Sequence, residues 1–170
     1  ATEDGKITSG EAWIAFEAGA YTGSPIAPGC MCVFSCYDVP NAKVDGFDVC
    51  VNKPRTNAYR APGSTQVCFA TETIVDEICK ERDIEPAEFR LNNAAQEGVR
   101  RVDGPVYGKV GMIETVQAIR DSDHYQTPLT GKFQGRGIAT GFWFNCGLKS
   151  AATATVNPDG TVSLVEGSTD

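Results

Sequence analysis

The segment from Ser64 onward carries the strongest periodicity in the sequence and constrains the fold more than any other feature. Its apolar residues recur every three or four positions, which is the spacing of one face of an α-helix. They are Val67, Ala70, Ile74 and Ile78, with Cys68, Val75 and Cys79 beside them. Ser64 or Thr65 is placed to cap this helix. Glu72 and most other charged residues fall on the solvent side, where Asp76 and Lys80 would form an i,i+4 ion pair.

Shorter elements are expected around this helix. The expected strands are 6–18, 30–37, 43–52, 133–144, 150–156 and 161–166, and the further helices are 86–93 and 112–121. The run 30–37 is apolar throughout, as in a strand buried on both faces. Asn157-Pro158-Asp159-Gly160 is typical of a type I turn that joins the last two strands. The expected fold class is α+β, with mixed sheets and two to three packed helices.

The net charge and the length of the chain limit the classes of protein to which it can belong. The formal net charge is −7, and the acidic excess falls in the middle third, where a solvated helix face accounts for it. The absence of a basic stripe disfavours nucleic-acid binding. No apolar run approaches the roughly 18–20 residues of a membrane span. The 170 residues suit one domain, but a chain that opens without Met and closes just after a strand looks cut at both ends.

The seven cysteines show no metal-binding spacing. None of them forms a CxxC pair, and His124, in a linker and expected to be exposed, is the only histidine. Cys30, Cys32 and Cys36 would share one face of the predicted strand. We therefore expect buried, reduced thiols in a cytoplasmic protein, and no metal site.

The junction at 57–66 is the part of the sequence that suggests binding. Gly63 would let the backbone approach a ligand closely, and the helix start after it offers free N–H groups with a partial positive charge. Arg60 adds a fork of donors. Together these groups could hold an anionic or carbonyl-rich ligand. The simpler alternative is a surface arginine in front of a capped helix.

An aromatic run at 142–144 has two interpretations as well. It consists of Phe142, Trp143 and Phe144. Such a run in a strand packs into a core, and it would be functional only if one ring lined a cavity. No Ser–His–Asp or Cys–His arrangement accompanies it, and no pair of carboxylates stands out as a general acid and base.

A series of short motifs follows one another along the chain. These motifs are Asp4-Gly5-Lys6-Ile7, Glu17-Ala18-Gly19-Ala20-Tyr21, Tyr37-Asp38-Val39-Pro40-Asn41, Asn57-Ala58-Tyr59-Arg60-Ala61-Pro62-Gly63-Ser64-Thr65-Gln66, Ile84-Glu85-Pro86-Ala87-Glu88-Phe89-Arg90-Leu91-Asn92-Asn93, Gly137-Ile138-Ala139, Gly141-Phe142-Trp143, Asn157-Pro158-Asp159-Gly160-Thr161-Val162 and Gly167-Ser168-Thr169-Asp170. Through the order of these motifs, the chain resembles the molybdopterin-binding large subunit of the xanthine dehydrogenase and aldehyde oxidase family. The resemblance covers essentially the whole chain and implies the molybdenum-cofactor-binding fold of that family.

The resemblance also implies an activity and site residues. The parent protein would be a molybdenum hydroxylase that uses water to hydroxylate an electron-poor carbon of an aldehyde, an N-heterocycle or a related aromatic. By the family pattern, Ala58, Tyr59 and Arg60 bind the molybdenum–pterin cofactor, either molybdopterin or its cytosine dinucleotide, largely through backbone groups. Pro62 takes the place of a phenylalanine that packs on substrate in purine-oxidising members. Phe142 to Phe144 fall near a second aromatic of that pocket.

The chain departs from the family pattern in ways that bear on substrate and catalysis. No arginine lies near Pro28, where xanthine oxidisers orient their substrate, which argues against a xanthine-like substrate. Ala61-Pro62 stands where aerobic carbon monoxide dehydrogenases carry a cysteine. The upstream cofactor loop, the glycine-rich segment expected after Asp170 and the general-base glutamate lie outside these residues. We therefore assign no catalytic residue and no metal ligand here.

The resemblance divides the chain and implies partners. Residues 1–96 would belong to the first cofactor-binding half and residues 97–170 to the start of the second, with a seam in the glycine-rich segment 97–111. Iron–sulfur clusters and FAD would reside on partner domains or subunits of a cytoplasmic enzyme that assembles as a dimer. These residues by themselves would be inactive. The rival hypothesis is a stand-alone, non-catalytic module that binds an anionic ligand or a protein partner at 57–66.

Overall fold

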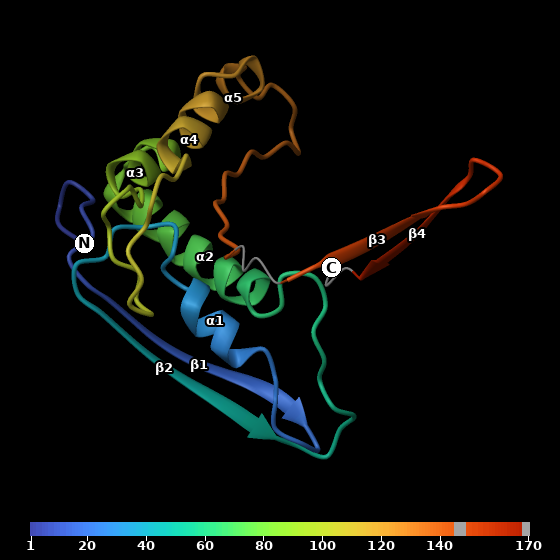
Figure 1. Ribbon diagram of the computed structural model, residues 1–170. Helices are drawn as coiled ribbons and strands as arrows, with labels where there is room; N and C mark the ends of the chain where they lie inside the picture. Colours follow the sequence, from blue (N-terminus) through green and yellow to red (C-terminus); the bar gives the residue numbers. More distant parts are fainter. Residues whose placement is uncertain (145–148, 168–170) are drawn as a thin grey trace.

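The computed structural model describes residues 1–144 and 149–167 and has the expected α+β character (Figure 1). In chain order its elements are β1 (Gly10–Gly19), α1 (Ile26–Cys32), β2 (Ala42–Cys50), α2 (Ser64–Arg82), α3 (Pro86–Asn92), α4 (Met112–Arg120), α5 (Asp123–Gln126), β3 (Ala151–Val156) and β4 (Val162–Gly167). The predicted helices correspond to α2, α3 and α4. None of the described helices is long and apolar enough to cross a bilayer.

Strands β1 and β2 form a parallel pair, and α1 lies in the connection between them. Gly10 pairs with Ala42 and the register continues to Phe16 and Asp48, with an irregularity after Glu17. Burial alternates along β1, as in a strand that packs on one face. The inner face of β1 packs against a cluster of Cys32, Val33 and Val67, so the sheet, α1 and the start of α2 share one core.

The prediction of a strand at 30–37 is wrong. Residues up to Cys32 belong to α1, and the chain then turns toward Tyr37. A continuous apolar run does not distinguish a buried strand from a buried helix. Here the helix touches the sheet on one side and α2 on the other, so it has little need of polar positions. Pro28 and Gly29 lie inside α1, near its start, where proline is tolerated.

Helix α2 forms as predicted, but its buried face is turned from the predicted stripe. Its buried residues are Ser64, Val67, Glu72, Val75 and Cys79. Ile74, predicted to be inside, is 55% exposed. Glu72, predicted to be outside, is 5% exposed. The predicted Asp76–Lys80 pair does not form, because Asp76 binds Arg90 of α3 instead, at 2.9 Å.

Helices α3 and α4 complete two further clusters of buried side chains. One joins Tyr37, Val75, Cys79 and Phe89, and the other joins Ala87, Val116 and Ile138. The side chain of Glu85 caps α3 by accepting a hydrogen bond from the Glu88 N–H at 2.7 Å. Asn93 just after α3 fastens the N-terminal segment, since its amide accepts from Ile7 N at 2.8 Å and donates to Gly5 O at 2.9 Å.

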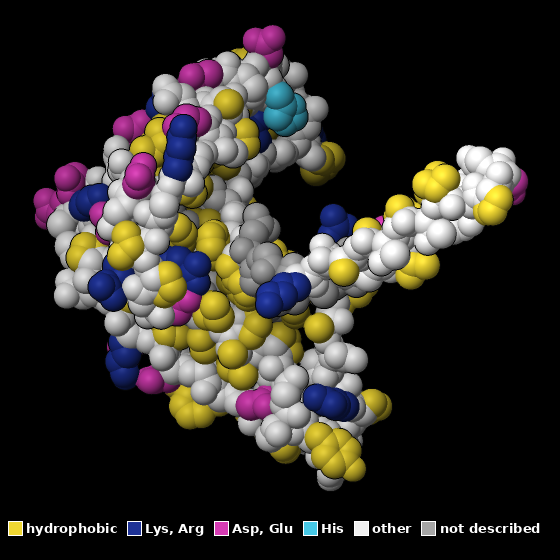
Figure 2. Space-filling model, in the orientation of Figure 1, with side chains coloured by type: hydrophobic (Ala, Val, Ile, Leu, Met, Phe, Trp, Pro, Cys, Tyr) yellow, Lys and Arg dark blue, Asp and Glu magenta, His cyan; other side chains and the backbone are white. Residues whose placement is uncertain are grey.

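The later part of the chain is less regular than predicted. Residues 133–144 form no strand, and His124 lies in the short helix α5 rather than in a linker. Strands β3 and β4 form the expected antiparallel hairpin, joined by a turn at Asn157–Gly160 in which Gly160 N donates to Asn157 O. The hairpin projects away from the helices, and the residues of both its strands are exposed (Figures 1 and 2).

Candidate functional site

The 57–66 junction surrounds an open cavity of about 470 Å³. The cavity is lined by Pro25, Thr56, Asn57, Tyr59, Arg60, Ala61, Pro62, Thr65 and Gln66. The structure therefore brings three of the predicted site residues, Tyr59, Arg60 and Pro62, to one place. Ala58 precedes them on the same exposed loop but does not line the cavity. Tyr59 is 88% exposed, so its ring is available for contact with another molecule.

The N-terminus of α2 opens onto this cavity without a side-chain cap. The N-cap residue is Gly63, and the hydroxyl of Ser64 donates instead to Phe142 O at 2.5 Å, so the predicted cap by Ser64 or Thr65 is wrong. The backbone N–H groups of Thr65 and Gln66 have no acceptor among the described residues. Free N–H groups and the helix dipole give this end of α2 a partial positive charge beside Arg60.

The loop holds an unusual backbone conformation just before the helix. Arg60 has a φ of 22° and Ala61 a φ of 53°, both in the left-handed region that side chains disfavour. Two successive residues of this kind cost free energy and occur where the surrounding structure imposes them, often at binding sites. The strain here falls on the segment that the family pattern assigns to the cofactor.

Gly63 packs closely against the start of α1. Its φ is 85°, and a Cβ atom at this position would lie 2.3 Å from Pro25 O and 2.7 Å from Gly29 N. The missing side chain therefore lets the start of α2 sit directly against the start of α1. Packing by itself thus requires glycine at this position, and the approach of its backbone to a bound molecule stays a prediction.

The aromatic run lies apart from this cavity. Phe142 and Phe144 pack against the core cluster of Cys32, Val33 and Val67, as the simpler interpretation predicts. The Phe142 ring meets Tyr107 edge-on at 5.7 Å, and the Arg101 guanidinium lies 5.3 Å from the Phe142 ring centre. Trp143 stacks on Phe144 at 4.4 Å and is 38% exposed. The only ring of the three that presents a large free surface is thus Trp143.

A buried polar network on α2 was missed by the sequence analysis. The Glu72 carboxylate accepts from Arg90 Nε at 2.9 Å, from Thr140 N at 2.8 Å and from Thr140 Oγ1 at 3.0 Å. It also accepts from the hydroxyl of Tyr37, whose pKa is raised by burial and further by the nearby carboxylate. Arg90 is fully buried. The one sequence signal for this network is Arg90 in the 84–93 motif, because a buried arginine needs a carboxylate partner on a neighbouring helix.

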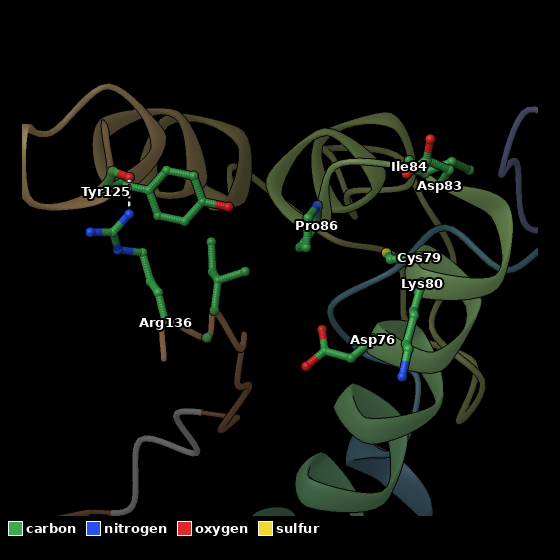
Figure 3. Close-up of a pocket in the computed structure, with 10 residues that line it drawn as sticks. Asp76, Cys79, Lys80, Asp83, Ile84, Pro86, Tyr125 and Arg136 are labelled. Carbon is green, nitrogen blue, oxygen red and sulfur yellow. Dashed lines mark hydrogen bonds between the residues drawn. The ribbon is translucent and has the colours of Figure 1, made fainter. Parts of the chain in front are cut away.

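A second cavity, of about 470 Å³, carries charges of both signs (Figure 3). Asp76 and Lys80 project from α2 on one side, and Tyr125 and Arg136 lie on the other (Figure 3). Arg136 donates to Tyr125 O at 2.6 Å. Burial, together with the Glu85 carboxylate that accepts from its hydroxyl, raises the pKa of Tyr125 to about 12. This cavity contains none of the predicted site residues.

The described cysteines are free thiols of varied exposure. Cys32 and Cys79 are buried, Cys50 is exposed, and Cys146 lies outside the described residues. Burial raises the pKa of the Cys36 thiol to about 12, and it also raises the pKa of Cys68. Such thiols stay protonated and unreactive near neutral pH. Among residues 1–144 and 149–167, no group of three or more His, Cys, Asp or Glu side chains is arranged to hold a metal ion.

The fold matches one part of a much larger protein of known structure. Aldehyde oxidoreductase from Desulfovibrio desulfuricans is similar to this chain with a TM-score of 0.82 at 23% sequence identity. The similarity covers 96% of this chain and 19% of that protein. This likeness establishes the architecture, including the arrangement of the sheet, α1 and α2.

The sequence places the chain in a family. Residues 1–94 match the model of the molybdopterin cofactor-binding domain, and the chain belongs to that family, as its motifs predicted. The nicotinate dehydrogenase large molybdopterin subunit of Eubacterium barkeri is 30% identical over 125 residues, which are 71% of this chain and 29% of that subunit. The aldehyde oxidoreductase of Megalodesulfovibrio gigas is 30% identical over 139 residues, 75% of this chain and 15% of that protein. The chain thus spans less than a third of these relatives.

Proposed function

We propose that this chain forms one wall of the cofactor site of a molybdenum hydroxylase. The observation that carries the proposal is the cavity at 57–66 in a member of the molybdopterin cofactor-binding family: Arg60, Thr65 and Gln66 all line it, and the backbone N–H groups of Thr65 and Gln66 have no acceptor among the described residues. A molybdenum–pterin cofactor carries phosphate, and a helix N-terminus beside an arginine suits an anion. The donor set of the loop therefore fits the group that the family implies.

The residues would divide the work of holding the cofactor. The Thr65 and Gln66 amides and the Arg60 guanidinium would bind its anionic part, while the exposed backbone of Ala58 and Tyr59 would contact the pterin. When bound, the cofactor supplies a two-electron redox centre that hydroxylates carbon with oxygen from water. Backbone donors suit such a site because they stabilise negative charge without titrating.

The substrate would be an aldehyde, an N-heterocycle or a related aromatic. Relatives named for aldehyde oxidation and for nicotinate dehydrogenation support this range. Pro62 beside the cofactor loop would shape the pocket from one side. The 142–144 aromatics would shape it from the other, with Trp143 offering the exposed ring. Iron–sulfur clusters and FAD on partner domains or subunits would carry electrons away within a dimeric, cytoplasmic enzyme.

The test is to replace Arg60 in the full-length subunit, assembled with its partners. We expect Arg60→Ala to lower the molybdenum and pterin content per subunit, with Arg82→Ala at the opposite end of α2 as the matched control. Elemental analysis and pterin fluorescence measure both. Unchanged cofactor content and turnover in Arg60→Ala would refute the site. A full-length protein that binds anions at this loop but holds no molybdenum would support the non-catalytic binding module instead.

A further inference from the structure

Three side chains on one face of α2 hold a segment that pairs with no strand among the described residues. Ser64, Cys68 and Glu72 are spaced four residues apart, so they line up along the helix. The Ser64 hydroxyl donates to Phe142 O at 2.5 Å, the Cys68 thiol donates to Thr140 O at 2.7 Å, and Glu72 accepts from Thr140 N at 2.8 Å. Residues 140–142 therefore run along α2 and antiparallel to it. The backbone groups of Thr140 and Phe142 form hydrogen bonds with side chains of α2.

Glu72 is the charged member of these three side chains, and it makes two hydrogen bonds to Thr140. It is 5% exposed, and Arg90 fixes it with Nε at 2.9 Å and Nη2 at 2.8 Å. Arg90 is itself held by Pro86 O at 3.0 Å and by Asp76 at 2.9 Å. A carboxylate locked by a buried arginine can hold a backbone N–H with little freedom to move. Thr140 is thus pinned to α2 by both its amide and its hydroxyl.

The same helix carries the cofactor loop at its N-terminus. The loop at 58–62 ends directly at α2, and Gly63 seats this end of the helix against α1. The segment held by the three side chains leads straight into the aromatic run at 142–144. One rigid helix therefore connects the two groups of residues that the proposed function places on opposite sides of the substrate.

We propose that Glu72 is a positioning residue that, with Ser64, holds the 140–144 segment against α2 and so sets where Trp143 lies relative to the cofactor loop. This inference rests on the proposed function. In this proposal Glu72 contacts neither substrate nor cofactor. Glu72 instead fixes the shape of the pocket, and the shape decides which substrates are preferred.

The experiment uses the full-length holoenzyme with Glu72→Gln and, as a milder change that keeps the buried ion pair, Ser64→Ala. Thr73→Ala is the matched control, because its hydroxyl bonds only within α2, to Phe69 O on the exposed side. Hydrogen–deuterium exchange of peptides covering 138–144 measures whether the segment is held. Loss of one such hydrogen bond should speed that exchange by about five-fold, while Thr73→Ala leaves it unchanged.

A second readout separates positioning from mere stability. The ratio of kcat/KM between small aldehydes and bulky N-heterocycles should change in Ser64→Ala and Glu72→Gln at unchanged molybdenum content per folded subunit. Unchanged exchange at 138–144 in both variants would overturn the inference. Faster exchange with an unaltered substrate ratio would overturn it too, since the segment would then be held for stability alone. A purified full-length parent protein that holds no molybdenum would refute the proposed function, whereas hydrogen–deuterium exchange at 138–144 would still show whether Glu72 and Ser64 hold the segment.

Discussion

The ion pair between Glu72 and Arg90 yields the sharpest prediction about stability. Replacing Arg90 by Met fills similar space but leaves the Glu72 carboxylate buried without a cation. Arg90 is fully buried and Glu72 is 5% exposed, so water cannot take the place of the lost charge. Removing one member of such a pair costs about 3–5 kcal/mol. We expect Arg90→Met to reduce the free energy of unfolding by that amount.

The double variant Glu72→Leu with Arg90→Met makes this reasoning refutable. Because both charges are then absent, we expect it to recover much of the loss, as buried pairs exchanged for apolar residues often do. Urea denaturation followed by tryptophan fluorescence measures the parent, the single variants Arg90→Met and Glu72→Leu, and the double variant. Arg82→Met, at the exposed end of α2, is the control and should stay within about 0.5 kcal/mol of the parent. A single Arg90→Met variant that loses less than about 1 kcal/mol, or a double variant whose loss equals the sum of the two singles, would refute the account.

Two further predictions concern backbone geometry and pH. Gly63→Ala should destabilise the chain by at least about 1–2 kcal/mol, because the φ of 85° disfavours any residue with a Cβ and this Cβ would also meet Pro25 O. Thermal unfolding measures the loss. Gly108→Ala is the control, since a Cβ there would have no atom within 4 Å. Hydrogen bonds from the Thr161 hydroxyl and amide lower the pKa of Asp159. The ionised carboxylate therefore stabilises the hairpin fully at pH values above its ordinary pKa near 3.8. This stabilisation is lost as the pH falls through the lowered pKa. Amide exchange of β3 and β4 between pH 5 and pH 2, corrected for intrinsic rates, should show this loss, and Asp159→Asn should remove it; an unaltered acid profile in that variant would contradict the assignment.

Local signals were sufficient to predict much of the fold. The helical spacing after Ser64, the proline at the start of α3 and the Asn157–Gly160 turn each encode their element within a few residues, and all three elements are present. The order of the motifs was also sufficient to identify the family. Tyr59, Arg60 and Pro62 could be brought together because they are neighbours in sequence.

The errors arose where long-range partners decide the outcome. The apolar run at 30–37 could not reveal that α1 would touch both the sheet and α2. The 133–144 segment resembles a strand, but its Thr140 and Phe142 backbone groups bond to α2 side chains rather than to another strand. Glu72 is buried because Arg90, 18 residues later, meets it. No local pattern encodes these pairings.

The four-residue spacing of Ser64, Cys68 and Glu72 also limits how this stretch of α2 can vary in length. Each added or deleted residue would turn everything beyond it by about 100° and shift it by about 1.5 Å along the axis. A single insertion between Ser64 and Glu72 would therefore put these two side chains on different faces of α2, so that they could no longer both bond residues 140–142. Insertions in 98–108, where Gly98, Gly104 and Gly108 have open space around them, carry no such penalty. Among relatives, we expect length changes to collect there and to be absent from the first two turns of α2.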